Sequence, residues 1–295
     1  MIKVIASDID GTLLNSQHRL SKDNIKAIMR ARECGIKFLI STGRKYKDTI
    51  TVLGSEDLAD GYITLSGAHT VSNKGELLNS IPLTEENISQ VINYTSGYPV
   101  SVILNTIEED YIIGNQKELE ESLLSQEKLF QGEKNVEIQE DHSLIQMLKK
   151  QTITVPSLEI LLSMKVPIYK IFILGGSQAV LNQLDQEIQQ IPTIASASSY
   201  ITNLEITHVN AQKGPVLRAV ITQLGYNMNE VMVIGDSMND YSMLSMDYGA
   251  TVAMENATEQ LKKVAKYITT DCDHHGVAYA INCLLDGNLE SIRKK

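Results

Sequence analysis

Val4-Ile5-Ala6-Ser7-Asp8-Ile9-Asp10-Gly11-Thr12 joins a short apolar run to two carboxylates that stand two residues apart. A short apolar run is typical of a buried strand in a parallel sheet. Carboxylates at the carboxyl end of such a strand are costly to bury for structure alone, and that edge of the sheet is where α/β proteins bind ligands. The stretch therefore predicts a metal-dependent site with Asp8 as a nucleophile and Asp10 as its acid/base partner.

Taken alone, residues 8–12 also fit two other interpretations. Asp and Gly favour tight turns, so the stretch could be a turn whose side chains only cap the backbone. It could also be a fragment of a calcium loop, but the distal Glu of such a loop is missing and the stretch follows a strand instead of a helix.

Strand and helix patterns alternate on either side of this stretch. Strands are expected over residues 3–7, 36–40 and 61–65, with helices over 22–34 and 45–53 between them. This order predicts a parallel sheet with helical crossovers. The alternation resumes with a helix over 213–224, a strand over 231–234, a helix over 240–246 and a strand over 250–254.

The middle of the chain has a different pattern, in which short strands and helices are mixed. Strands are expected over residues 100–104, 110–114, 168–174, 194–199 and 204–208, helices over 85–95 and 178–190, and a polar helical segment with loops over 115–143. Such a mixture is typical of an α+β domain with an antiparallel sheet. We therefore predict a doubly wound α/β core formed by residues 1–83 and 209–295, interrupted by an inserted α+β domain at 84–208.

Three further motifs fall at the ends of predicted strands or the starts of helices. Thr42-Gly43 ends a strand, and its hydroxyl and backbone N–H groups can hold a phosphate or merely cap a helix. Lys213, next to Gly214, can neutralise phosphate charge or be an ordinary surface lysine. Gly235-Asp236-Ser237-Met238-Asn239-Asp240 can hold a hard cation such as Mg²⁺ together with Asp8, or be an acidic turn. Together these motifs favour a phosphate site at one edge of the sheet.

Composition limits the partners that we expect. The 295 residues carry a formal net charge of −10, which argues against nucleic acid or an anionic membrane as the main partner. The three cysteines form no Cys-x-x-Cys pair, and the N-terminal apolar run is too short for a signal peptide. We therefore expect a cytoplasmic protein with reduced thiols and no membrane span.

The ordered set of motifs resembles the haloacid dehalogenase superfamily of phosphohydrolases, and within it the Cof-type branch with a large C2-type cap domain. Residues 8–14, 41–44, 210–214 and 235–240 are similar to its four motifs, and residues 252–257 to the strand that follows the fourth. The resemblance implies a Rossmann-like core, with the inserted domain acting as a cap that determines substrate specificity. Ser66 and Glu255 depart from the family pattern, and no role is assigned to Arg44.

The resemblance implies a role for each acidic residue. Asp8 would form an aspartyl-phosphate, while Asp10 would protonate the leaving group and then activate water. Mg²⁺ would be held by Asp8, the backbone carbonyl of Asp10 and Asp236, with Asp240 supporting these ligands.

The phosphoryl oxygens would be bound by the side chains of Thr42, Lys213 and Asn239 and by backbone N–H groups near Ile9 and Gly43. The sequence thus predicts a Mg²⁺-dependent phosphatase of small phosphorylated metabolites, with sugar phosphates as the class that the resemblance implies. It is expected as a monomer or small homo-oligomer.

Two other functions remain open at this level. A phosphomutase would produce an isomer of its substrate instead of free phosphate. A non-catalytic sensor of phosphometabolites would bind without turnover, although such a protein has no need of Asp10.

Overall fold

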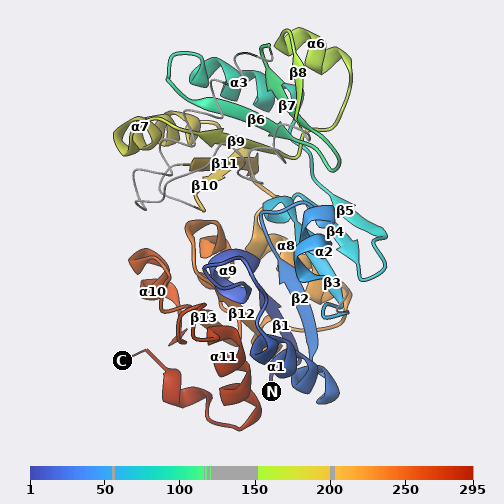
Figure 1. Cartoon of the computed structure of the whole chain (residues 1–295), viewed down its shortest axis with the longest axis vertical. Coiled ribbons are helices and arrows are strands. Elements are labelled where there is room, and N and C mark those ends of the chain that lie inside the picture. The colour runs from blue at the N-terminus through green and yellow to red at the C-terminus, as the bar shows by residue number, and fades with distance from the viewer. Residues whose placement is uncertain (55–56, 116, 118–119, 121–151, 200–202, 295) are drawn as a thin grey trace. The chain divides into compact units, whose positions relative to one another are not determined.

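The computed structural model of the chain describes residues 1–54, 57–115, 117, 120, 152–199 and 203–294. The chain divides into two compact units, which Figure 1 shows by colour along the sequence. The core unit comprises Met1–Ile81 and Asn210–Lys295, and the inserted unit comprises Pro82–Val209. No helix in the described ranges is both long and apolar enough to cross a membrane.

The core unit is built on one eight-stranded sheet. Its strands are β1 (Val4–Ser7), β2 (Lys37–Ser41), β3 (Gly61–Thr64), β4 (His69–Ser72), β5 (Leu77–Ser80), β12 (Val231–Gly235), β13 (Ala250–Ala253) and β14 (Tyr267–Ile268). They lie in the order β14-β13-β12-β1-β2-β3-β4-β5. All neighbours from β14 to β3 are parallel, whereas β3, β4 and β5 pair in antiparallel fashion.

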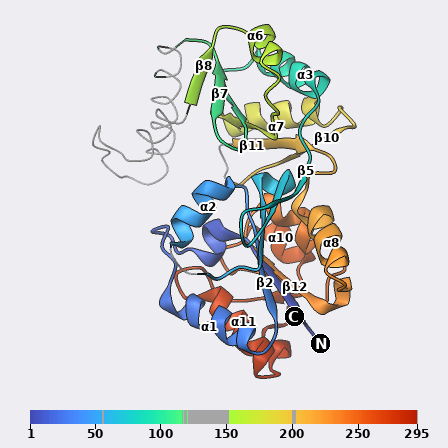
Figure 2. The same ribbon diagram turned by 90° about the vertical axis from the view of Figure 1, so that its right-hand side faces the viewer.

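Helices cover both faces of this sheet, and β1 and β12 are therefore buried along their whole length. The helices are α1 (Lys22–Glu33), α2 (Tyr46–Leu53), α8 (Lys213–Gln223), α9 (Tyr241–Leu244), α10 (Glu259–Val264) and α11 (Gly276–Leu285). Ser21 caps α1 by accepting a hydrogen bond from the Asn24 N–H, and α1 then packs against α11. Figure 2 shows α1 and α8 on opposite sides of β2 and β12.

The strand order reverses between β1 and β12, and this reversal places the acidic motifs side by side. From β1 the chain proceeds to β2 and β3 in one direction, and from β12 to β13 and β14 in the other. The two strands pair in register, with Ser7 opposite Ile234, and the Asp8 N–H donates to the Ile234 carbonyl over 3.0 Å. Asp8 and Asp236 therefore leave the sheet at the same edge, at a topological switch point.

The inserted unit has a six-stranded sheet of its own. Its elements are α3 (Glu85–Thr95), β6 (Ser101–Asn105), β7 (Asp110–Ile113), β8 (Thr152–Val155), α6 (Leu158–Ser163), β9 (Lys170–Leu174), α7 (Gln178–Ile188), β10 (Ile194–Ala197) and β11 (Asn203–His208). The sheet order is β10-β11-β9-β6-β7-β8, and α3 and α7 pack on it through one apolar cluster that includes Val91 and Leu184.

The predicted fold class is confirmed, but four strands of the structure, β4, β5, β8 and β14, were not predicted, and one strand pairing differs from the prediction. The hairpin of β4 and β5 was not predicted, because β5 is largely exposed and has no buried apolar run. The inserted sheet is not wholly antiparallel, since β7 and β8 are parallel, with Asp110 opposite Thr152. Residues 114–151 separate these two strands, which is long enough for a crossover connection. Most of the helical segment predicted over 115–143 falls outside the described residues.

Candidate active site

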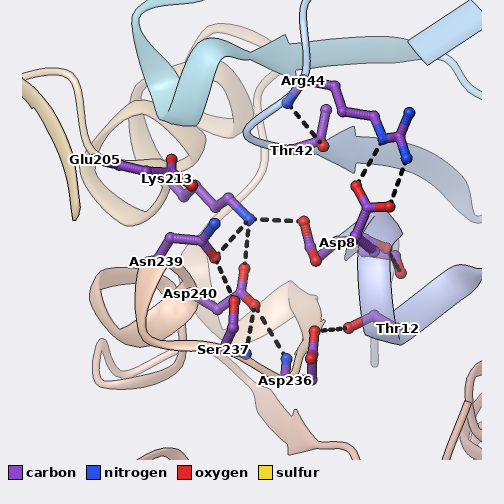
Figure 3. A network of polar contacts seen from close by, with 12 residues as sticks. Asp8, Thr12, Thr42, Arg44, Glu205, Lys213, Asp236, Ser237, Asn239 and Asp240 are labelled. Carbon is purple, nitrogen blue, oxygen red and sulfur yellow. Dashed lines mark hydrogen bonds and ion pairs between the residues drawn. The ribbon is translucent and has the colours of Figure 1, made fainter. Parts of the chain in front are cut away.

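Lys213 joins the two acidic strand ends (Figure 3). Its Nζ atom lies 2.7 Å from Asp8 Oδ1, 2.7 Å from Asp240 Oδ1 and 3.2 Å from Asn239 Oδ1. The lysine is completely buried, so its interpretation as a surface residue is wrong. Three protein oxygens replace the water that a buried ammonium group loses.

The start of α8 brings Lys213 into this position by a close approach to α9. A Cβ atom on Gly214 would lie 2.0 Å from the Ser242 carbonyl oxygen, so only glycine allows the approach. The Gly214 carbonyl also accepts a hydrogen bond from the Tyr248 hydroxyl over 2.9 Å. The glycine after Lys213 therefore has a packing function that the sequence motif did not reveal.

Asp240 organises the loop that follows β12. Its Oδ2 atom accepts hydrogen bonds from the N–H groups of Asp236 and Ser237, over 3.0 and 3.2 Å. A Cβ atom on Gly235 would lie 2.5 Å from the Asp240 Cγ atom, which explains glycine at the end of the strand. Ser237 Oγ donates to Asn239 Oδ1 over 2.8 Å and so orients this amide toward Lys213.

The carboxylates outnumber the nearby cation. Ligand oxygens of Asp8, Asp236 and Asp240 all lie within 4.8 Å of one another. Burial, reinforced by the charge of Asp240, raises the pKa of Asp8 well above its usual range and that of Asp236 to about 7. Burial acts to lower the pKa of Lys213, but Asp240 and Asp8 more than offset it, so Lys213 is charged. The cluster therefore has more carboxylates than cations, and the raised pKa values of Asp8 and Asp236 show that their full ionisation is favoured only when further positive charge is bound.

Asp10 points into different surroundings. Arg44 holds its carboxylate through two hydrogen bonds, with Nε 2.6 Å from Oδ2 and Nη2 2.6 Å from Oδ1. His18 Nδ1 lies 3.5 Å from Oδ1. Burial acts to raise the pKa of Asp10, but the hydrogen bonds from Arg44 and His18 bring it below its usual range. The Asp10 carboxylate is outside the acidic cluster, and the metal-ligand role expected of the Asp10 backbone carbonyl stays a prediction.

The other predicted phosphate-binding residues lie beside this network. Thr42 and Gly43 follow β2, which is the neighbour of β1. Thr42 is buried, and its Oγ1 atom accepts a hydrogen bond from the Arg44 N–H over 3.2 Å. Ile9 is fully buried in the turn after Asp8. The structure thus joins Asp8, Asp236, Asn239, Asp240 and Lys213 by direct contacts or proximity, while strand order places Thr42, Gly43 and Ile9 next to them.

Besides Arg44, His18 and Ser237, three further residues contribute to the site although no role was predicted for them. Thr12 Oγ1 donates to Asp236 Oδ1 over 2.7 Å. A Cβ atom on Gly11 would lie 2.3 Å from Asp236 Oδ2, and Gly11 also has φ +73°, so glycine is needed twice over. Asn256 Nδ2 donates to the Gly11 carbonyl over 2.8 Å. All three stand in the quoted motifs, but only the fold reveals their partners.

The fold and the site together define an α/β enzyme with a carboxylate nucleophile candidate at the switch point of its sheet. Residues 5–281 match the family of haloacid dehalogenase-like hydrolases, and the chain belongs to that family. The predicted membership of this superfamily and the predicted enzyme class, a phosphatase, are confirmed.

Several named relatives are similar to this chain over nearly their whole length. Phosphatase YwpJ of Bacillus subtilis is 28% identical over 286 residues, which cover 96% of this chain and 100% of the relative. The 5-amino-6-(5-phospho-D-ribitylamino)uracil phosphatase YwtE of the same organism is 28% identical over 297 residues, covering 97% and 99%. A solved haloacid dehalogenase-like hydrolase from B. subtilis has a TM-score of 0.81 at 26% identity, covering 96% and 100%.

Proposed function

We propose that this hydrolase is a Mg²⁺-dependent phosphatase of small phosphorylated metabolites that works through an aspartyl-phosphate on Asp8. The observation that carries the proposal is the buried contact between Lys213 and two carboxylates, Asp8 and Asp240, beside a third, Asp236. One lysine does not balance two buried carboxylates and a third that is partly exposed, so the site is suited to bind a cation and a phosphate together.

The donor set fits Mg²⁺. Hard cations of this kind prefer carboxylate and carbonyl oxygens and keep several waters, and the oxygens of Asp8, Asp236 and Asp240 are close enough to share one ion. The ion would supply positive charge that offsets the repulsion between these carboxylates and draws electrons from the phosphoryl group.

The chain's own residues would carry out two chemical steps. A carboxylate oxygen of Asp8 forms a bond to phosphorus while the bond to the leaving oxygen breaks, and Asp10 gives that oxygen its proton. Water then attacks the phosphorus and loses a proton to Asp10, and the electron pair of the Asp8–phosphorus bond returns to Asp8. Free phosphate and the starting enzyme result.

The remaining predicted residues would hold the phosphoryl oxygens during both steps. Lys213 and Asn239 present a charged donor and an amide from one side, and Thr42 and the N–H of Gly43 extend from the end of β2. Fixed donors aimed at developing negative charge are the largest contribution to catalysis of this kind.

The substrate class is part of the proposal. YwtE is named as a phosphatase of a compound with a 5-phospho-D-ribityl group, which is a phosphorylated polyol chain. This name supports sugar phosphates and related polyol phosphates as substrates. We assign the selection of the leaving group to the inserted unit, because the catalytic candidates all come from the core unit.

The test is phosphate release from a panel of sugar, polyol and aryl phosphates, with Mg²⁺ or with EDTA. We expect Mg²⁺-dependent release by the wild type, loss in Asp8→Asn on the order of 10⁴-fold or more, and full activity in Asp247→Asn, whose exposed carboxylate pairs with Lys266. Turnover by Asp8→Asn would refute the nucleophile. Isomer formation without phosphate would indicate a mutase, and binding without turnover would indicate a sensor.

A further inference from the structure

Arg44 binds the Asp10 carboxylate through a bidentate pair of hydrogen bonds. Both guanidinium–carboxylate distances are 2.6 Å, and each nitrogen contacts a different oxygen. The backbone of Arg44 is fixed as well, since its N–H donates to Thr42 Oγ1 and its carbonyl accepts from the Leu65 N–H over 2.9 Å. The guanidinium group is therefore anchored at the end of β2 and oriented toward the turn after β1.

This bidentate contact fixes the plane and the position of the Asp10 carboxylate. A planar guanidinium that makes two parallel hydrogen bonds restrains both, which a lysine ammonium group does not. The side chains of Arg44 and Asp10 are 28% and 24% exposed, and pairs this accessible to water contribute little to stability. The contact is thus better suited to orient Asp10 than to hold the fold together.

The bidentate contact also favours the unprotonated form of Asp10. When both oxygens accept from a guanidinium group, the carboxylate carries no proton. A protonated Asp10, ready to donate to a leaving group, must give up one of the two contacts. The observed geometry therefore matches the unprotonated form of Asp10, which activates water in the second step, whereas the first step requires one of the two contacts to open.

We propose that Arg44 is a positioning residue that orients the Asp10 carboxylate for hydrolysis of phosphorylated Asp8, the second step of the reaction. The inference rests on the proposed function. In this step the water oxygen bonds to phosphorus, the water proton moves to Asp10, and the bond between phosphorus and the Asp8 oxygen breaks with its electron pair returning to Asp8. Arg44 acts on this step only through the orientation of Asp10.

The experiment uses p-nitrophenyl phosphate, whose leaving group departs without a proton, so the first step does not need Asp10. Wild type, Arg44→Gln and Arg44→Lys are mixed with substrate and Mg²⁺, and p-nitrophenolate and the phosphorylated protein are measured by rapid mixing, acid quench and intact mass. In Arg44→Gln we expect a burst of about one p-nitrophenolate per site, accumulated phosphoprotein, and a kcat lowered roughly 10- to 100-fold. The value of kcat/KM should change by less than about threefold.

Two variants complete the comparison. Arg44→Lys retains the charge without the bidentate geometry, so it should accumulate less phosphoprotein than Arg44→Gln but more than the wild type. Arg30→Gln is the matched control, because Arg30 Nη2 contacts the Asp286 carboxylate on the surface of the same unit over 2.5 Å. Its kinetics should equal those of the wild type.

The outcomes separate this inference from the function on which it rests. A wild type that releases no phosphate with Mg²⁺ overturns both. An active wild type overturns the inference alone if Arg44→Gln shows no burst, whether its kcat is unchanged or falls in proportion to kcat/KM. Equal loss of both constants would assign Arg44 to substrate binding or to the first step.

Discussion

Both units bury a lysine against acidic side chains, and the two sites differ in how charge is balanced. In the inserted unit Lys170 Nζ lies 3.3 Å from Glu205 Oε2 and 5.3 Å from the centre of the Phe172 ring. In the core unit Lys213 contacts Asp8 and Asp240, with Asp236 in the same cluster. The first contact is between one cation and one carboxylate, whereas carboxylates are in excess in the second.

The origin of the side chains differs as well. Lys170 and Glu205 stand on neighbouring strands, β9 and β11, of one sheet. The core cluster is assembled from the end of β1, the loop after β12 and the start of α8. A cross-strand pair of opposite charges stabilises a sheet, but like charges gathered from separate elements have to be offset by a bound cation or by protonation. An excess of carboxylates over cations, rather than burial itself, therefore distinguishes the core cluster from the pair in the inserted unit.

The largest effect is expected when the lysine of the core cluster is removed: Lys213→Met should lose catalysis. The change removes the ammonium group that contacts Asp8, so phosphoryl charge is stabilised less in the transition state. We expect kcat/KM to fall about 10³-fold with Mg²⁺ present. The measurement is steady-state kinetics on variants whose folding is verified by circular dichroism. A loss below tenfold would place phosphate binding elsewhere.

Lys170→Met should have the opposite profile. Removing one partner leaves Glu205, whose side chain is 4% exposed, as a buried charge without this lysine, so we expect the free energy of unfolding to fall by about 3 kcal/mol. Adding Glu205→Leu should restore most of the loss, because the double variant buries no charge at this position. Denaturant unfolding of the four proteins gives the coupling. Turnover of p-nitrophenyl phosphate by the folded variants should stay near the wild-type rate.

Part of the reactive site could be predicted from sequence because its signal is local. Asp8 and Asp236 each follow an apolar strand directly, and pairing of those strands at a sheet edge was enough to expect them together. The contact between Arg44 and Asp10 is different, since it joins residues 34 positions apart through the conformations of two turns. No periodicity or spacing encodes which way a side chain points at the end of such a turn.

The same limit applies to the sheets. Strands with buried apolar runs were predicted within a residue or two of their bounds, as for β12, because periodicity reports burial. β5 and β8 were not predicted, because both are largely or partly exposed and have little burial to report. Exposed strands are thus where sequence patterns lose their information.

The smallest expected effect is a dependence of stability on pH that arises from the core cluster. In EDTA, the pKa of Asp236 is raised to about 7 in the folded protein, against an ordinary value near 3.8 in the unfolded chain. The folded state therefore binds more protons than the unfolded state between these two pH values. The contribution of Asp236 to stability is thus fully present below about pH 4 and is lost as the pH rises through 7. We expect the free energy of unfolding of metal-free protein to drop by roughly 1–2 kcal/mol from pH 5 to pH 7.

Asp236→Asn cannot ionise at this position, so its unfolding free energy should depend less on pH over the same range. Mg²⁺ should act most at pH 7, where the carboxylates are ionised, and stabilise the wild type more than Asp236→Asn because binding to the folded state adds to its stability. Urea titrations at both pH values, with EDTA or Mg²⁺, provide the four comparisons. Equal pH dependence in both proteins would show that the excess charge of the core cluster does not reside on Asp236.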